Sequence, residues 1–199
     1  MDKKEILSTY RQAMLDEAKA IERSIGAFGT EVIDAVTLIQ NATGKVIMCG
    51  VGKSGHIGRK LAASMSSMGT PAFFVHADEA VHGDLGMIEK NDVVILLSNS
   101  GETREVLDVL PSLNKIGAKK ISITRSHDSS LAEACDVSLA YDYEEESDHL
   151  HLAPTVSSTL TLAAGDALAI TLSKLKGFTP EDFHLYHPGG SLGKKLEDK

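Results

Sequence analysis

Two short loops rich in glycine and hydroxyl side chains stand out as candidates for chemistry. The first is Gly50-Val51-Gly52-Lys53-Ser54-Gly55, and the second is Ser98-Asn99-Ser100-Gly101-Glu102-Thr103. Each loop follows an apolar run and precedes a segment with helical periodicity. Backbone N–H groups at the start of a helix, joined by serine and threonine hydroxyls, suit a phosphate group. Two such loops at one edge of a sheet favour a phosphate site more strongly than one loop alone.

Three other interpretations compete for these loops. The plainest is that Ser54 and Ser98 only cap helices. The string GVGKSG also matches a dinucleotide-binding fingerprint, and Asp78 stands in the range of a ribose-binding acid, but that interpretation leaves the second loop unexplained. A P-loop for nucleoside triphosphates is excluded by spacing, because the motif needs a glycine where Ile47 stands.

Histidines and acids are the other candidates. They include His76, His82, His149, His151 and His187, and the acidic run 144–146. Solvated loop positions explain most of them without any function. The pair His149-x-His151 beside Asp148 could form part of a metal site, although no fixed ligand spacing supports one.

The elements that must position these residues follow from periodicity. Apolar spacing of three to four predicts helix over the first forty or so residues, with a second helix from about 31 to 40. Continuous apolar runs predict strands at 45–50, 71–77, 93–99, 119–124 and 136–142. Further helices are predicted at 54–69, 102–118 (kinked or interrupted at Pro111), 129–134 and 155–177.

Strands that alternate with helices and lack polar alternation indicate a parallel sheet covered on both faces. We therefore expect an α/β fold, a three-layer α/β/α sandwich with five parallel strands in the flavodoxin-like order 2-1-3-4-5. In that order, the loops after the first and third strands meet where strand order reverses. We expect one domain over 1–199, with a helical segment at 1–43 and the sheet and C-terminal helices at 44–199. Small residues along 155–177 predict close packing, including against another subunit.

Composition excludes several classes of function. The 199 residues are 42% hydrophobic and 24% charged, as in an ordinary globular protein. The net charge of −8 without a basic block argues against nucleic-acid and anionic-membrane partners. No apolar run approaches the roughly 20 residues of a membrane span, and the N-terminus lacks a secretory signal. Two distant cysteines in apolar contexts, Cys49 and Cys135, fit buried thiols in a reducing cytoplasm.

Four motifs together resemble one family. They are GVGKSGHIGRK, HGDLGM, SNSGET and HPGGSLG, and the similarity extends from about Asp16 to Lys195. The sequence resembles the sugar isomerase (SIS) domain family and, within it, the bacterial D-arabinose-5-phosphate isomerases. Many members continue into a C-terminal pair of cystathionine-β-synthase-type domains, whereas this sequence ends at Lys199 without them.

The resemblance implies specific residue roles. The implied catalytic residues are Lys53, His82, Glu105, Glu146 and His187. The implied substrate- and phosphate-binding residues are Gly52, Ser54, Gly69, Thr70, His76, His82, Ser98, Asn99, Ser100, Gly101 and Thr103. It further implies an inhibitory zinc at His76 rather than a required cofactor, and a homotetramer with sites between subunits, where a neighbour could supply His187. One departure lies beside the site: Ser147–His151 replaces the family's usual Ala-Cys-Pro segment, which puts the exact sugar in doubt.

The implied reaction is aldose–ketose isomerisation of a phosphosugar, most simply D-ribulose 5-phosphate and D-arabinose 5-phosphate, through a cis-enediol. Such a reaction needs a base at carbon, a proton shuttle for the oxygens and a group that stabilises the enediolate. We expect Glu146 or Glu105 as the base, and such a carboxylate would gain from a raised pKa, which burial in a closed interface would give. His187 would open the sugar ring or shuttle the oxygen proton, Lys53 would supply positive charge, and His82 would orient hydroxyls.

Two alternatives stay open. One is an isomerase of another phosphosugar, such as a hexulose 6-phosphate. The other is a non-catalytic sensor that binds a sugar phosphate in the same fold. Binding without turnover would identify the sensor.

Overall fold

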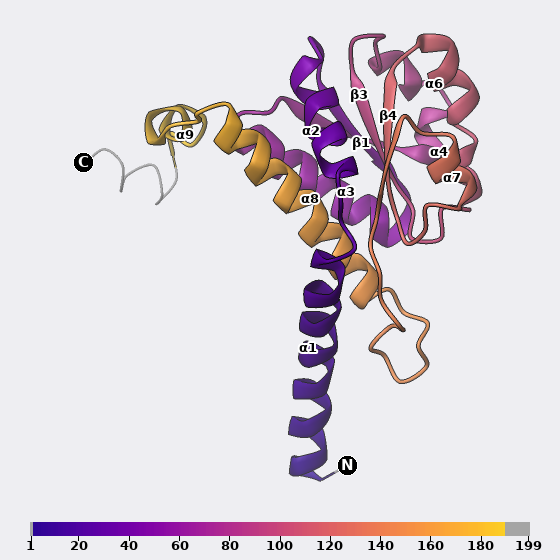
Figure 1. The fold of residues 1–199 in the computed structure, drawn as a ribbon, viewed down its shortest axis with the longest axis vertical. Helices are drawn as coiled ribbons and strands as arrows, with labels where there is room; N and C mark the ends of the chain where they lie inside the picture. The colour runs from indigo at the N-terminus through magenta and orange to yellow at the C-terminus, as the bar shows by residue number, and fades with distance from the viewer. Residues whose placement is uncertain (1, 190–199) are drawn as a thin grey trace.

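The computed structural model describes residues 2–189 of the chain, and Figure 1 shows their arrangement. The strands are β1 (Val46–Gly50), β2 (Ala72–His76), β3 (Val93–Leu97), β4 (Lys119–Thr124) and β5 (Val137–Ala140). The helices are α1 (Lys3–Ile25), α2 (Glu31–Asn41), α3 (Gly52–Ser67), α4 (Ala77–Ala80), α5 (Arg104–Leu107), α6 (Leu110–Ile116), α7 (Ser130–Glu133), α8 (Val156–Leu175) and α9 (Pro180–Tyr186), with the 3-10 helix η1 (Asp84–Met87).

The five strands form one parallel sheet in the order β2-β1-β3-β4-β5, which confirms the predicted topology. Every residue of β1 and of β3 is buried, because helices cover both faces. In the register of the sheet, Gly50 at the end of β1 lies beside His76 of β2 and Leu97 of β3. The loops that follow β1 and β3 therefore leave the same edge of the sheet, side by side.

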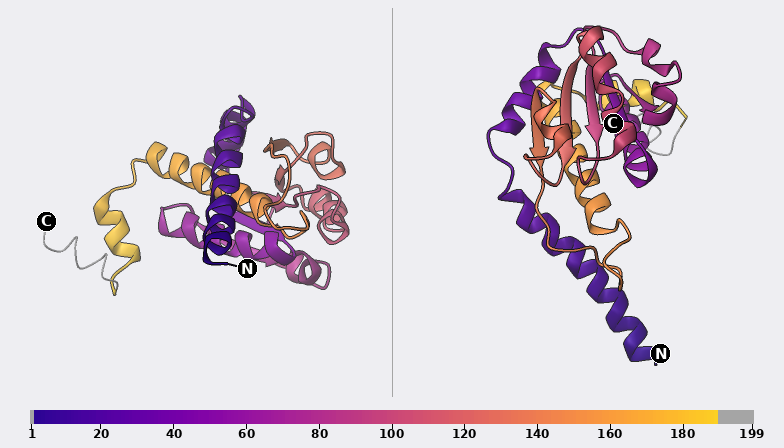
Figure 2. Two further views of the ribbon diagram at one scale, coloured as in Figure 1. Left: turned by 90° about the horizontal axis from the view of Figure 1, so that it is seen from below. Right: turned by 90° about the vertical axis from the view of Figure 1, so that its right-hand side faces the viewer.

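Alternating side chains of the strands divide the core into two layers. Val46 and Met48 point to the face that α2, α3 and α8 cover. Ile47 and Cys49 point to the opposite face, where α4, α5, α6 and α7 pack. The views in Figures 1 and 2 show α8 lying along the sheet beside α2 and α3. This packing places the start of α8 at the edge where the strands end.

Helix α1 is the exception to this compact arrangement. Its N-terminal half extends away from the sheet, while its C-terminal end contacts the start of α8 and the segment after β5 (Figure 1). Several large apolar side chains on α1 are about half exposed or more: Ile6, Leu7, Tyr10, Met14, Leu15 and Ile25. The apolar face that the sequence predicted for this helix is therefore largely uncovered in a single chain.

The helical region predicted over 102–118 is interrupted near Pro111 rather than kinked, because the structure has two helices there. Helix α5 ends at Leu107, and α6 begins at Leu110 with Pro111 in its first turn. Proline has no N–H to donate, so it is tolerated in a first turn and breaks a helix interior. Gly117, with φ of +82°, ends α6 in the left-handed conformation. The sequence analysis assigned no residue ranges to the short elements α4, η1 and α9.

Helix α8 is long and apolar enough to cross a membrane by length and composition, unlike the other described helices. No such run was expected from the sequence, because Ser, Thr, Asp166 and Lys174 interrupt it. In the structure, Leu160, Leu168 and Leu172 of this helix are buried against the sheet. Its apolar character is therefore that of a core helix.

We predict that Gly165→Ala destabilises the fold. A Cβ at this position of α8 would collide with the fully buried side chain of Leu61 in α3. The collision should outweigh the roughly 1 kcal/mol by which alanine favours a helix. We expect a net loss of about 1–2 kcal/mol in the free energy of unfolding, measured by urea denaturation. Gly86→Ala is the control, because a Cβ there meets nothing within 4 Å. Equal stability of both variants would refute close α3–α8 packing.

Candidate functional site

The loop after β1 turns directly into α3, which begins at Gly52, two residues before the predicted start. Gly52 has φ of +55°, and a Cβ on Gly55 would lie 3.1 Å from the carbonyl oxygen of Gly50. Glycine at these positions permits the sharp turn. Ser54 lies inside α3 and Val51 is the N-cap residue, so the interpretation of Ser54 as a helix cap is wrong. Lys53 is exposed at the second position of the helix.

The loop after β3 is held by its own side chains. The hydroxyl of Ser98 lies 2.7 Å from that of Thr103 and accepts the N–H of Gly101 at 3.0 Å. Gly101 has φ of +69°, and a Cβ there would collide with Ser129. Ser100 is exposed at the tip of this turn. Ser98 therefore shapes the loop from within rather than capping a helix, since Thr103 is the N-cap residue of α5.

The side chain of Asn99 points from this loop toward the segment after β5. Its Nδ2 donates to the Tyr143 hydroxyl at 2.9 Å, and its Oδ1 accepts from the Tyr141 hydroxyl at 3.0 Å. The Tyr143 hydroxyl in turn donates to Oε1 of Glu146 at 3.2 Å. Neither tyrosine was predicted as a site residue, although their alternation past the end of β5 was the signal that could have revealed two inward-facing side chains.

Glu146 is 7% exposed and lies at the amino end of α8. Its Oε2 accepts three hydrogen bonds, from the N–H groups of Thr155 (2.8 Å) and Ser157 (3.1 Å) and from the Thr155 hydroxyl (3.2 Å). A carboxylate at this end of a helix also lies in the favourable direction of the helix dipole. Among the described residues, Tyr143 is the donor to Oε1, so Oε1 keeps more acceptor capacity than Oε2.

The expected raised pKa of Glu146 is wrong in direction. Burial raises the pKa of this carboxyl, but the hydrogen bonds from Ser157 and Thr155 together outweigh burial and lower the pKa below its ordinary value. Glu146 is therefore ionised at neutral pH.

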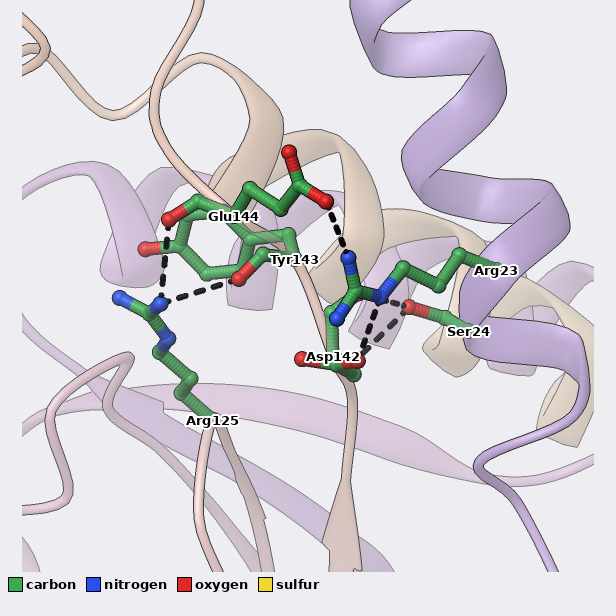
Figure 3. A network of polar contacts seen from close by, with 6 residues as sticks. All are labelled: Arg23, Ser24, Arg125, Asp142, Tyr143 and Glu144. Atoms are coloured by element: carbon green, nitrogen blue, oxygen red, sulfur yellow. Dashed lines mark hydrogen bonds and ion pairs between the residues drawn. The ribbon is translucent and has the colours of Figure 1, made fainter.

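Helix α1 holds the segment that carries Glu146 from one side (Figure 3). The Nε of Arg23 lies 2.6 Å from an oxygen of Asp142, and its Nη1 lies 2.6 Å from one of Glu144. The hydroxyl of Ser24 donates to the carbonyl oxygen of Asp142 at 2.7 Å. The Ser24 residue is buried, and its hydroxyl fixes the backbone at Asp142. The ion pairs of Arg23 are about half exposed or more, so they orient the segment after β5 more than they stabilise the fold.

Arg125, which follows β4, holds the same segment from the other side. Its guanidinium carbon lies 4.3 Å from the centre of the Tyr143 ring, and its Nη2 donates to the backbone oxygens of Tyr143 (2.9 Å) and Glu144 (3.2 Å) (Figure 3). The stacking and the two hydrogen bonds fix both the ring and the backbone of Tyr143. Neither arginine was predicted as a site residue.

A cavity of about 260 Å³ lies between α1 and this segment, with Glu146 in its wall. Its lining carries both signs of charge, from Asp16, Lys19, Arg23, Glu144, Glu145 and His151, among others. A lining with this many hydrogen-bonding groups suits a hydroxylated ligand better than an apolar one.

The predicted site residues separate into two groups. We call the first the loop-edge group, since each member follows the carboxyl end of a strand: Gly52, Lys53, Ser54, His76, His82, Ser98, Asn99, Ser100, Gly101, Thr103, Glu105 and Glu146. Within this group His82 and Glu105 are exposed, and His76 is partly exposed beside Asp78.

The second group, which we call the far-end group, comprises Gly69, Thr70 and His187. Lys176, just after α8, donates to the Gly69 carbonyl (2.9 Å) and the Thr70 hydroxyl (3.0 Å). Helix α8 has 20 residues and is therefore about 30 Å long. Because Glu146 lies at its other end, a single chain does not bring the two groups together.

His187 ends α9, beyond α8 in Figure 1. Its ring stacks on Phe183 with centroids 3.9 Å apart, and its Nδ1 lies 2.8 Å from the Phe183 carbonyl oxygen. The remainder of the HPGGSLG motif, from 190 onward, lies outside the described residues.

Two of the residues considered for metal binding, Asp148 and His151, have other partners. Asp148 accepts the N–H groups of Leu150, Leu152 and Ala153, and the Nδ1 of His151 lies 2.9 Å from the Glu146 carbonyl oxygen. Within residues 2–189, no group of three His, Cys, Asp or Glu side chains is placed to hold a metal. His76 has Asp78 at 3.7 Å, and two groups fall short of the ligands that a protein zinc site needs.

Comparison with known proteins adds sequence and structural relatives. An arabinose 5-phosphate isomerase KdsD from Pseudomonas aeruginosa is 48% identical over 180 residues, which cover 90% of this chain and 55% of that protein. An arabinose 5-phosphate isomerase KpsF from Escherichia coli is 45% identical over 192 residues, covering 96% and 61%. The chain thus spans little more than half the length of these curated relatives.

The solved structures agree with the sequence relatives. An E. coli CFT073 protein in complex with arabinose 5-phosphate is 53% identical, with a TM-score of 0.92, covering 94% of this chain and all of that one. A putative sugar-phosphate isomerase from Listeria monocytogenes has the same TM-score at 33% identity, covering 95% of this chain and all of that one. The SIS domain family model matches residues 38–171, from the end of α2 through most of α8. The chain therefore belongs to the SIS domain family.

Proposed function

We propose that this protein is a phosphosugar aldose–ketose isomerase that interconverts D-ribulose 5-phosphate and D-arabinose 5-phosphate. The observation that carries the proposal is the Glu146 carboxylate, which is buried and ionised, and whose Oε1 is connected through the Tyr143 hydroxyl to Asn99 in the loop after β3. Two relatives named arabinose 5-phosphate isomerase, and a structure at 53% identity with arabinose 5-phosphate bound, support this choice of sugar.

In the proposed mechanism, Glu146 is the base at carbon. Oε1 takes the proton from the carbon next to the carbonyl, the C–H electron pair forms the C=C bond of a cis-enediol(ate), and the carbonyl oxygen gains the negative charge. The proton then returns to the former carbonyl carbon, while the hydroxyl on the other carbon loses its proton to become the new carbonyl and the charged oxygen gains one, so no redox cofactor is needed. Glu105 is exposed in α5, whereas Glu146 is held in one orientation by four donated hydrogen bonds, which favours Glu146.

The remaining loop-edge residues serve binding and charge. The turn at Ser100 presents the loop after β3 to solvent, where its backbone could hold the phosphate. Lys53, the second residue of α3 just after the end of β1, supplies positive charge for the phosphate or the enediolate. His82 orients the sugar hydroxyls, and His187 opens the ring or shuttles the oxygen proton. Zinc at His76 would be an adventitious occupant.

We further propose a homotetramer in which a neighbour's far-end group completes the loop-edge group. Two observations support assembly. Gly69 and Thr70 lie at the opposite end of α8, a helix about 30 Å long, from Glu146, and His187 lies beyond that end; α1 also exposes a row of large apolar side chains that includes Tyr10 and Met14. The free thiols Cys49 and Cys135 favour a reducing compartment, so we place the reaction in the cytoplasm.

Turnover is the first prediction from this proposal. The protein incubated with D-arabinose 5-phosphate in D₂O with a chelator should form D-ribulose 5-phosphate, seen by proton NMR, with deuterium at the exchanged carbon. Binding without conversion would support a sensor, and conversion only of a hexulose 6-phosphate would change the assigned sugar. If the protein neither binds nor converts any of these sugars, the proposal is contradicted.

Glu146→Gln should lower kcat by about 10²–10⁴-fold, because the amide cannot accept the carbon-bound proton. Glu145→Gln is the matched control, since this neighbouring carboxyl is exposed and lacks the contacts to α8. If Glu146→Gln keeps its turnover while Glu105→Gln loses it, the role of the base belongs to Glu105.

The lowered pKa of Glu146 predicts a pH dependence of stability. The folded pKa lies below the ordinary 4.5, so the ionised carboxylate stabilises the fold above that value, and this contribution disappears as pH falls through the folded pKa. The difference in free energy of unfolding between wild type and Glu146→Gln should therefore be largest at neutral pH and shrink in acid. Urea denaturation at several pH values measures it, and a difference that grows in acid would contradict the sign.

A further inference from the structure

We propose that Asn99 and Tyr143 are positioning residues that orient the reactive oxygen of Glu146 and connect it to the loop after β3. The inference deepens the proposed function and rests on it for the role of Glu146 as a base. It assigns the side chain of Asn99, which resemblance placed among the phosphate-binding residues, to a different task. It also adds Tyr143, which was not among the predicted site residues.

The contacts form a continuous chain of hydrogen bonds across the site. It starts at the Thr161 hydroxyl in α8, which donates to Tyr141 at 3.1 Å. Tyr141 donates to Oδ1 of Asn99 at 3.0 Å, and Nδ2 of Asn99 donates to Tyr143 at 2.9 Å. Tyr143 donates to Oε1 of Glu146 at 3.2 Å. Three elements, α8, the loop after β3 and the segment after β5, thus meet in one network.

The ionised carboxylate of Glu146 is the charged group in this hydrogen-bond network. It determines the direction of the hydrogen bonds from Tyr143 through Asn99 to Tyr141. An ionised carboxylate can only accept, so the Tyr143 hydroxyl must donate to Glu146. The Tyr143 oxygen can then only accept, which turns Nδ2 of Asn99 toward it and Oδ1 toward Tyr141. Tyr141 must donate to that oxygen, and the Thr161 hydroxyl, 3.1 Å from the Tyr141 oxygen, lies 2.9 Å from the Ser157 carbonyl oxygen, to which it also donates. The orientation of the Asn99 amide is therefore a consequence of the charge on Glu146.

Burial makes this arrangement costly to break. Tyr141, Tyr143 and Thr161 are 0%, 4% and 4% exposed. Burial raises the pKa of Tyr143, so its hydroxyl keeps the proton that it donates. An unpaired hydroxyl or amide in such a site would lose its hydrogen bond without gaining one from water. The network therefore permits few alternative orientations of Glu146.

Asn99 is held at its backbone as well as at its side chain. Its carbonyl oxygen accepts from the N–H of Arg125 at 3.0 Å and from the hydroxyl of Thr124 at 3.2 Å. Both polar groups of its amide are already paired with tyrosines. The adjacent Ser100 remains exposed for a ligand. A shift of this loop when phosphate binds would therefore act through Asn99 and Tyr143 on Oε1.

Other charged groups also surround Glu146, and their charges act on its carboxylate together with the hydrogen-bond network. From α1, Asp16, Lys19 and Arg23 line the same cavity; from its own segment, Glu144, Glu145 and His151 do so; and Arg125 approaches from the end of β4. The substitutions below leave all of these groups in place.

The test is a direct titration of the Glu146 carboxyl carbon by ¹³C NMR, assigned with Glu146→Gln. Tyr143→Phe removes the donor to Oε1 and should raise the pKa of Glu146 by about one unit. Asn99→Asp should also raise the pKa, because the new carboxylate would accept the Tyr143 proton and add negative charge nearby. Tyr141→Phe is the matched control: an equally buried tyrosine that bonds Asn99 but not Glu146, for which we expect a smaller rise.

Kinetics on D-arabinose 5-phosphate provide the second readout. Tyr143→Phe should lower kcat about tenfold with little change in KM, because it disturbs the base and leaves the phosphate loop intact. An unchanged pKa of Glu146 in Tyr143→Phe, or equal rises in Tyr143→Phe and Tyr141→Phe, would overturn the inference while leaving the isomerase proposal standing. Absence of wild-type turnover would instead overturn the proposed function, and the titration would still decide whether Tyr143 orients Glu146.

Discussion

The structure of the site depends on one interaction, the Glu146 carboxylate held at the amino end of α8. Oε2 accepts the N–H groups of Thr155 and Ser157, which would otherwise lack partners at the start of the helix. This contact ties the segment after β5 to α8, and α8 packs against α3 and the sheet. The position of the carboxylate thus follows from the position of the helix, and the helix is positioned by the core.

Burial and hydrogen bonding act on this carboxylate in opposite directions. Burial alone would favour the neutral acid, whereas four donors favour the anion, and the donors prevail. The surrounding arginines contribute by geometry: Arg125 orders Tyr143 by stacking, and Arg23 anchors the segment to α1. An ionised carboxylate is therefore held in a site that is largely shielded from water.

The sequence was sufficient to predict the sheet, because buried parallel strands such as β1 and β3 appear as uninterrupted apolar runs. It also located the two loops, whose glycines indicate tight turns. It could not separate α5 from α6, since a proline is compatible with either a kink or a first turn. The sequence also could not predict the hydrogen-bond partners of Asn99 and Glu146. The tyrosine partners of Asn99 lie more than 40 positions away in the sequence, and the α8 partners of Glu146 lie about ten positions away, across a segment without regular periodicity. The predicted roles of Lys53, His82 and His187 remain predictions.

The length of α8 has a further consequence. Glu146 is anchored at one end of the helix, and Lys176 holds Gly69 and Thr70 at the other. The length of α8 therefore sets the distance between the loop-edge surface and the far-end surface of the subunit. Its close contact with α3 at Gly165 prevents sliding along that neighbour. An insertion or deletion of one turn would displace one end by about 5.4 Å relative to the other. In an assembly where the loop-edge group of one subunit meets the far-end group of another, the length of α8 therefore sets the spacing between sites. That spacing can change only by whole residues or turns added to or removed from α8.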